Sequence, residues 1–204
     1  VIDRDNDHIY QPGLLFLPFG KYNARDLVRP RKMLLPDWVD LVLAEIDRVL
    51  PEEQEVLLTN GERIAYDILI VSTGTRIDPT QTEGLTGPGW MDSIFDFYTL
   101  EGARALGLAL QDWKGGRLVL NVADMPIKCP VAPLEFLFLA DCDFVERGFR
   151  DNVEIVYATP LEGAFTKPRA SAQLSELIDR KNIKLEADFQ LASVDGEAKV
   201  LKGY

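Results

Sequence analysis

One cysteine in a proline-rich loop is the residue of this chain best suited to chemistry. Cys129 lies in the stretch Met125–Pro133, which reads Met-Pro-Ile-Lys-Cys-Pro-Val-Ala-Pro and joins an expected strand to an expected helix. The unpaired N–H groups at a helix start and the ammonium group of Lys128 both favour the thiolate, the nucleophilic form of cysteine. Three prolines stiffen the loop. A small buried side chain is the other interpretation, because free cysteine is among the most buried residue types.

The turn that carries Cys129 contains no glycine. The strand expected at Leu118–Val122 begins a βαβ unit, and such a unit needs a glycine-rich first turn if its backbone is to meet a pyrophosphate. The turn reads Asn121-Val-Ala-Asp-Met-Pro126 instead, and Asp124 places a negative charge where a phosphate would lie. The pattern therefore predicts a nucleotide-binding topology without the residues to bind a nucleotide.

Two features nearer the N-terminus are typical of cofactor sites. Asp3 follows an expected strand end, where a carboxylate of a dinucleotide-binding unit binds the adenosine ribose, although a single aspartate there is also an ordinary turn residue. The run Asp67-Ile-Leu-Ile-Val71 predicts a strand buried on both faces that ends at Ser72-Thr73-Gly74. A glycine there would let the backbone approach a flat or anionic ligand, and the alternative is a plain strand-to-loop turn.

The composition excludes several classes of function. The net charge of −11 argues against nucleic acid as a partner, because nucleic-acid binding needs a basic face. Two cysteines are too few for a disulfide framework. Cys142 lies in the middle of an expected helix among apolar residues, and we expect its side chain to pack in the core. The single histidine, His8, leaves little from which to build a histidine metal cluster or a catalytic triad. The chain opens on Val1 and an expected strand end, which resembles the middle of a protein.

Residues 1–98 are expected to form the first domain. A strand ends at Asp3, and further strands at 39–46, 55–59 and 62–66 form a small antiparallel meander. Asn60-Gly61 is the strongest hairpin signal in the chain. The meander feeds the strand expected at 67–71.

Residues 99–204 are expected to form the second domain, in which strands and helices alternate. Helices are expected at about 101–113, 133–147 and 170–181, and strands at 117–122, 153–158 and 183–189, with a hairpin in 194–204. Thr99 suits the first helix cap, and Pro133 and Gly148 suit the two ends of the second helix. A βαβαβ order implies a parallel sheet. The fold class is therefore α/β, with two Rossmann-like units, the first truncated, and a small β-meander.

The sequence also resembles a known family. Val1-Ile-Asp-Arg4 with His8-Ile-Tyr-Gln-Pro12 is similar to the second strand and following loop of flavoprotein oxidoreductases with two dinucleotide-binding domains. Tyr66–Gly74 is similar to the second flavin motif of that class. Pro126-Ile-Lys-Cys-Pro130 with Ala132–Phe136 resembles the sulfide:quinone oxidoreductases, and this resemblance covers essentially the whole chain.

The resemblance implies a flavin enzyme of two substrates, sulfide and a membrane quinone. FAD would lie in the first domain, where Asp3 would hold the ribose, the backbone of Ile46 would meet the adenine, and the backbone of Ser72, Thr73 and Gly74 would approach the cofactor. Cys129 would carry sulfur near the flavin, as a persulfide or a disulfide with a second cysteine further along the family's sequence. Electrons would pass from sulfide to FAD and then to quinone.

The chain departs from the family pattern in ways that predict a fragment. The family's N-terminal glycine fingerprint, its partner cysteine and its C-terminal membrane-docking elements have no counterpart in these residues, and Phe95 stands near a position where many members have a further cysteine. Such a fragment need not bind FAD or turn over substrate alone. For the parent protein we expect peripheral membrane contact through a region outside this chain. We expect the cytoplasmic face of a prokaryotic membrane, with the periplasmic face as an alternative. A homo-oligomer is a further alternative to a single chain.

Three related flavoproteins and one non-enzyme remain as alternatives. The flavoproteins are a type II NADH dehydrogenase, a coenzyme A disulfide reductase and the flavin subunit of a flavocytochrome c sulfide dehydrogenase. The turn Asn121–Pro126 argues against the users of NADH, because it lacks the glycines that a pyrophosphate needs. The non-enzyme alternative is a binding module that has kept the fold and lost the flavin.

Overall fold

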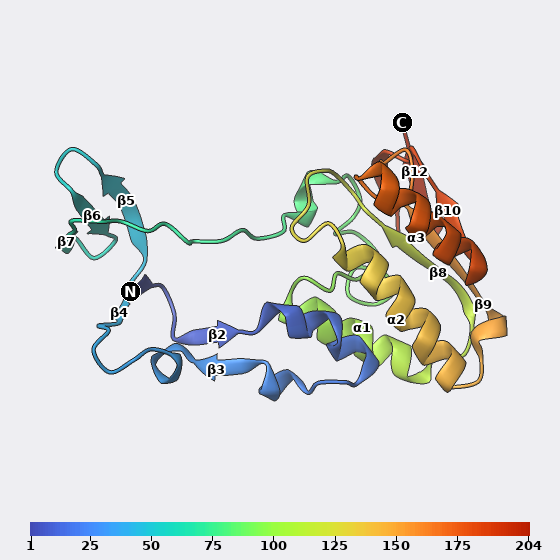
Figure 1. Ribbon diagram of the computed structural model, residues 1–204, viewed down its shortest axis with the longest axis horizontal. Coiled ribbons are helices and arrows are strands. Elements are labelled where there is room, and N and C mark those ends of the chain that lie inside the picture. The colour runs from blue at the N-terminus through green and yellow to red at the C-terminus, as the bar shows by residue number, and fades with distance from the viewer. The chain divides into compact units, whose positions relative to one another are not determined.

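The computed structural model describes residues 1–204 as two compact units (Figure 1). The first unit comprises Val1–Tyr10 and Arg25–Thr75, and the second comprises Gln11–Ala24 and Arg76–Tyr204. The domain boundary expected at residue 98 differs from this division, because residues 76–98 pack with the second unit. No helix has the length and apolarity that a bilayer crossing requires.

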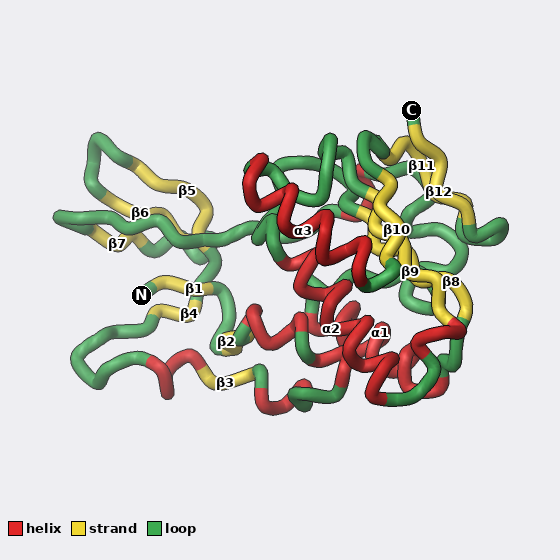
Figure 2. The backbone as a smooth tube through the Cα atoms, turned by 45° about the vertical axis from the view of Figure 1, so that its right-hand side comes forward, coloured by secondary structure: helices red, strands yellow, loops and turns green.

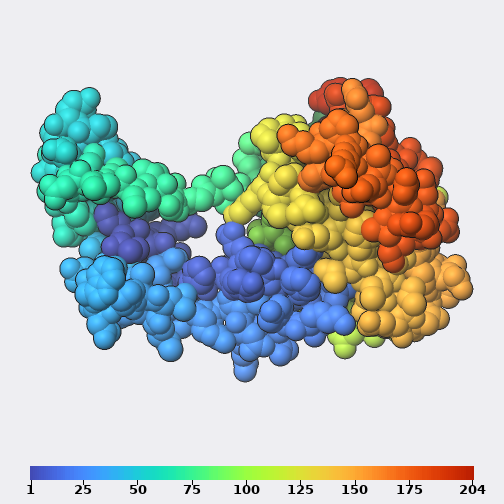
Figure 3. Space-filling view, viewed as in Figure 1, coloured from blue at the N-terminus to red at the C-terminus, as the bar shows by residue number.

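The second unit is built on a three-stranded parallel sheet, as the alternation of strands and helices predicts. Its strands are β8 (Gly116–Asn121), β9 (Val153–Ala158) and β10 (Ile183–Glu186), in the spatial order β10-β9-β8. Its helices are α1 (Leu100–Asp112), α2 (Ala132–Glu146) and α3 (Pro168–Arg180). Helices α2 and α3 are the crossovers between successive strands, and both lie on the face of this unit that Figure 3 shows. An antiparallel hairpin of β11 (Leu191–Asp195) and β12 (Val200–Gly203) follows.

The helix ends follow local chemistry. The Thr99 hydroxyl accepts a hydrogen bond from the N–H of Gly102 at 2.9 Å, which caps the start of α1 as expected. Pro133 lies in the first turn of α2, where its missing N–H costs no intrahelical bond. Gly148 follows the end of α2 with φ of 76°, a conformation that a glycine adopts without steric cost.

The core of the second unit lies between α2 and the central strand β9. Phe136, Leu137 and Phe144 of α2 and Ile155 and Tyr157 of β9 are each at most 2 % exposed. Burial of large side chains of this kind supplies most of the driving force for folding. It fixes the position of α2, and therefore of the loop that carries Cys129.

A buried ion cluster ties the second half of α2 to the start of β9 and the end of α3. The Asp141 carboxylate contacts the Arg150 Nε at 2.7 Å and the Lys181 Nζ at 2.5 Å. Burial opposes ionisation of Asp141, but the hydrogen bonds and charges of Lys181 and Arg150 outweigh it and hold the pKa of Asp141 below its usual range. Arg150 also donates to the Lys181 carbonyl oxygen at 2.7 Å, so the cluster has satisfied partners.

The first unit contains three small sheets (Figure 2). Strand β1 (Ile2–Asp3) pairs parallel to β4 (Val42–Leu43), and β2 (Asp7–Ile9) pairs antiparallel to β3 (Val28–Pro30). Strands β5 (Ile46–Leu50), β6 (Glu55–Leu58) and β7 (Arg63–Ala65) form an antiparallel meander, as expected. Its first strand was expected at 39–46 but lies at 46–50, because within 39–45 only Val42–Leu43 is a strand and it pairs with β1. At the hairpin turn of the meander, Gly61 has φ of 87° and the Asn60 Oδ1 accepts from the N–H of Glu62 at 2.9 Å.

Short 3₁₀ turns occur in both units. They cover Gln11–Leu15, Leu17–Phe19, Ala24–Asp26, Arg31–Leu34, Pro79–Gln81 and Arg150–Asn152.

The strand expected at 67–71 is wrong. The segment is extended without a sheet partner, and Ile68, Ile70 and Val71 are 84 %, 82 % and 66 % exposed. A strand buried on both faces needs a neighbour at each edge and cover on each face. The three small sheets of the first unit offer this segment neither, so an apolar β-branched run remains open to solvent.

Candidate functional site

Cys129 lies where the sequence predicts, in the loop between the end of β8 and the start of α2. Its side chain is exposed, which excludes the alternative of a buried core cysteine. Its backbone has φ of 56°, in the left-handed region, and its carbonyl oxygen accepts from the N–H of Ala132 at 3.1 Å. A residue other than glycine in this region is strained, and such strain concentrates at functional sites.

The start of α2 has no side-chain cap. Val131 is the N-cap residue and makes no side-chain hydrogen bond to the first turn. The N–H groups of Leu134 and Glu135 both point to the Val131 carbonyl oxygen, at 3.0 and 3.1 Å. Cys129 precedes the helix by three residues and Lys128 is exposed beside it. A helix start carries partial positive charge, so Cys129 lies in a loop where two positive features, the helix start and Lys128, come near in sequence.

The sulfur stands at the carboxyl edge of the parallel sheet. Asn121 and Ala158 end β8 and β9 in register, and the Ala158 carbonyl oxygen accepts from the N–H of Val122 at 2.9 Å. In open α/β sheets, ligands bind at this edge. The Asp124 Oδ1 accepts from the N–H of Met125 at 2.7 Å, so this carboxylate folds onto its own turn. No glycine opens the turn, and the residues present do not fit a dinucleotide pyrophosphate.

Tyr98 is a neighbour of the cysteine that the sequence did not reveal. Its hydroxyl oxygen is fully buried and has no hydrogen-bond partner. Its ring stacks on Phe97 at 5.1 Å, and Phe97 stacks on Phe136 of α2 at 4.7 Å. Burial, followed by the negative charges of Cys129 and other nearby groups, raises the pKa of Tyr98 to about 12. At neutral pH this side chain is therefore a protonated, unused hydrogen-bond donor within electrostatic range of the thiol.

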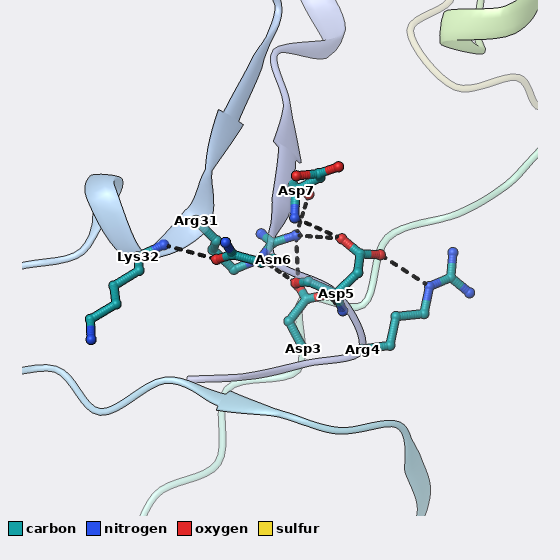
Figure 4. Close-up of polar contacts among 7 residues, drawn as sticks. All are labelled: Asp3, Arg4, Asp5, Asn6, Asp7, Arg31 and Lys32. Carbon is teal, nitrogen blue, oxygen red and sulfur yellow. Dashed lines mark hydrogen bonds and ion pairs between the residues drawn. The ribbon is translucent and has the colours of Figure 1, made fainter.

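In the first unit, Asp3 is held in an acidic loop (Figure 4). Its Oδ2 lies 3.1 Å from the Nη2 of Arg31, and its side chain remains 32 % exposed. The same Nη2 donates to the Asp7 carbonyl oxygen at 3.0 Å, and the Arg31 Nε donates to the Asp5 carbonyl oxygen at 3.3 Å. Figure 4 shows Arg4 directed away from this group, toward the Asp5 carboxylate at 3.6 Å.

The structure brings only some of the expected flavin-site residues together. The Asp3 carbonyl oxygen accepts from the N–H of Ala44 at 2.9 Å, which places Asp3 close to the start of β5 at Ile46. Ser72, Thr73 and Gly74 are exposed and lie outside any sheet. Gly74 has φ of 73°, but a Cβ there would meet nothing within 4 Å, so no close backbone approach is formed at this turn. A carboxylate beside a strand edge can accept hydrogen bonds from the ribose hydroxyls of an adenosine group. To that extent the residues present fit FAD.

Three further features add no chemistry to the site. The side chain of Cys142 does not pack in the core as expected. It is exposed on α2, with its Sγ 3.6 Å from the Glu146 Oε1. No group of three or more histidine, cysteine or carboxylate side chains is placed to hold a metal ion. A hollow of about 680 Å³ is lined by Gly116, Val153 and Ile183, which begin the three parallel strands, so it lies at the edge opposite Cys129.

Comparison with known sequences gives one consistent result. No protein-family profile matches the chain. The chain is 23 % identical over 215 residues to the mitochondrial sulfide:quinone oxidoreductase of Mus musculus, which covers 98 % of this chain and 48 % of the mouse protein. The Dictyostelium discoideum enzyme is also 23 % identical, over 98 % of this chain and 44 % of its own length. The chain thus spans about half the length of the curated relatives it matches.

Solved structures share the fold. The sulfide:quinone oxidoreductase of Aquifex aeolicus has a TM-score of 0.79 at 19 % identity, over 95 % of this chain and 46 % of that protein. The NDH2 protein of Plasmodium falciparum has a TM-score of 0.64 at 13 % identity, over 95 % of this chain and 43 % of that protein. The fold is that of the Rossmann-like FAD/NAD(P)-binding oxidoreductases. Over nearly all of its own length, the chain is similar to about half the length of sulfide:quinone oxidoreductases.

Proposed function

We propose that this chain is part of a FAD-dependent sulfide:quinone oxidoreductase in which Cys129 carries sulfur. The observation that supports this most is the exposed, left-handed Cys129 ahead of the uncapped start of α2. A purely structural cysteine needs neither exposure nor strain. The similarity over 98 % of the chain to proteins named for this reaction supports the same assignment.

The residues of this chain would bind and stabilise the sulfur. When Cys129 forms a disulfide with a second cysteine, sulfide would attack the second cysteine's sulfur: a new S–S bond forms there, the disulfide bond breaks, and Cys129 leaves as a thiolate. The start of α2 and Lys128 would stabilise the negative charge of that thiolate. FAD, when bound, supplies a two-electron acceptor that passes its electrons to a quinone. We assign to Asp3 and Ile46 the adenosine end of that cofactor, and to Ser72, Thr73 and Gly74 a backbone contact with it.

The substrates and the location follow from the same proposal. Sulfide and a membrane quinone would be the reactants, and contact with a membrane would use residues outside this chain. The expected cytoplasmic face of a prokaryotic membrane gains no support from the curated relatives named above, which are mitochondrial. A homo-oligomer stays open.

The two exposed cysteines allow a matched test in the complete gene product. Cys129→Ser should abolish reduction of bound flavin by sulfide, followed as loss of the yellow flavin absorbance, while the flavin stays bound. Cys142→Ser, at the other free and exposed cysteine, should leave the rate unchanged. Equal rates for the wild type and Cys129→Ser would refute the role of Cys129.

Reduction of the flavin by NADH distinguishes the main alternative, a type II NADH dehydrogenase, from the proposed enzyme. The type II NADH dehydrogenase assignment needs a second unit that binds a dinucleotide. The turn before Cys129 has no glycine, and Asp124 adds a negative charge there. NADH should therefore leave the flavin oxidised under conditions in which sulfide reduces it.

A further inference from the structure

The register of a short hairpin decides where Arg31 lies. In the β2–β3 pair, Asp7 is opposite Pro30 and His8 is opposite Arg29. Arg31 follows directly, and its backbone N–H donates to the Asn6 carbonyl oxygen at 2.5 Å. A shift of one residue would turn the arginine side chain to the other face of the hairpin. The hairpin thus brings a cation from 28 residues along the chain to the acidic loop that contains Asp3.

The Arg31 guanidinium is fixed by backbone as well as by charge. Two carbonyl oxygens, of Asp5 and Asp7, accept from it at 3.3 and 3.0 Å, and its side chain is only 21 % exposed. A planar guanidinium held by two carbonyls has little freedom to rotate. Its contact with the Asp3 Oδ2, at 3.1 Å, therefore determines how that carboxylate is turned.

Asp3 keeps capacity for a ligand in this arrangement. Its second oxygen, Oδ1, has one long contact, from the N–H of Asp5 at 3.5 Å. Each carboxylate oxygen has two acceptor sites, so lone pairs remain for hydroxyl donors. Without Arg31, the carboxylates of Asp3, Asp5 and Asp7 would repel one another within five residues of chain, and Asp3 would keep only the long contact from the N–H of Asp5.

We propose that Arg31 is a positioning residue that orients the Asp3 carboxylate to accept hydrogen bonds from the ribose hydroxyls of an adenine nucleotide. The inference rests on the proposed flavin function, because FAD contains an adenosine ribose. Arg31 itself touches the Asp3 carboxylate, the Asp5 carboxylate at 3.9 Å and the loop backbone. Its effect on the ligand would act entirely through Asp3.

The test compares two nucleotides that differ only in the ribose hydroxyls. ADP and 2′,3′-dideoxy-ADP are titrated by calorimetry into the flavin-depleted complete gene product. Hydroxyls bonded to a charged carboxylate should make ADP bind about tenfold tighter than the dideoxy form. Arg31→Gln and Asp3→Asn should each reduce that ratio to about one, and the double variant should lose nothing more.

Arg4→Gln is the matched control. It removes the same charge from the same loop, but Arg4 contacts only Asp5, at 3.6 Å, and is largely exposed. It should keep the preference for ADP. Thermal unfolding of each variant separates orientation from support of the hairpin, because Arg31→Gln also removes two bonds to the backbone.

The outcomes distinguish this inference from the proposal beneath it. An Arg31→Gln protein that keeps the ADP preference while Asp3→Asn loses it overturns the positioning role, even if its melting temperature falls. A wild type that binds both nucleotides equally, or neither, overturns this inference and the ribose role of Asp3. Flavin that copurifies with the wild type would still support the proposed enzyme class.

Discussion

Two tyrosines in the second unit should respond in opposite ways when each is replaced by phenylalanine. The Tyr98 hydroxyl is buried and has no partner, whereas the hydroxyl of Tyr157, which is 1 % exposed, is hydrogen-bonded to the Thr159 side chain. A buried polar group without a partner costs about 1–3 kcal/mol, and a satisfied hydrogen bond contributes about 1 kcal/mol. Tyr98→Phe should therefore stabilise the second unit by about 1 kcal/mol or more, and Tyr157→Phe should destabilise it by about 1 kcal/mol.

The assay uses the helices, because α1, α2 and α3 all belong to the second unit. Urea unfolding followed by helical circular dichroism therefore reports on that unit alone. In thermal unfolding each kcal/mol corresponds to about 2–4 °C for a protein of this size, so the two variants should separate by about 4 °C or more. Equal destabilisation by both substitutions would refute the reasoning, because it would mean that the Tyr98 hydroxyl has a partner in solution.

Three further experiments test the ionisation of Tyr98, the Asp141 ion cluster and the exposed segment 67–71. The pKa of Tyr98 should be about 12, above the ordinary tyrosine value of about 10. Its contribution to stability is therefore complete below about pH 10 and is lost as the pH rises through 12. Cys129→Ala should lower this pKa, as measured by ultraviolet titration of the tyrosine. Asp141→Asn should cost about 1–3 kcal/mol, because it leaves two partly buried cations without their carboxylate. Glu154→Gln, in an exposed pair, should cost less than about 1 kcal/mol in the same urea experiment. Ile70→Ser should change stability by less than about 0.5 kcal/mol and should reduce self-association in light scattering, since Ile70 is 82 % exposed.

The local patterns of the second unit were sufficient to predict its elements. Strand β9 has the predicted bounds, and the three helices begin within two residues of the expected positions. Each of these elements packs against its neighbours in sequence, so the hydrophobic period and the end signals describe what the structure uses. The position of Cys129 followed from the same information.

The errors came from features that depend on distant parts of the chain. The run 67–71 has the composition of a buried strand, but burial requires sheet neighbours that the first unit does not provide. Cys142 lies among apolar residues in sequence and yet faces solvent, because α2 buries a different side. Arg31 and Tyr98 gave no signal, since the contact of Arg31 with Asp3 depends on hairpin register and the hydroxyl of Tyr98 on the packing around it.

The left-handed backbone at Cys129 has a consequence for how this loop tolerates change. A side chain in that conformation costs about 1–2 kcal/mol relative to the right-handed form, and glycine alone avoids most of the cost. A glycine at this position would therefore relax the loop, and a valine would strain it further. Folding stability by itself therefore favours glycine over cysteine at this point of the backbone, and the chain keeps the thiol there at a cost to stability.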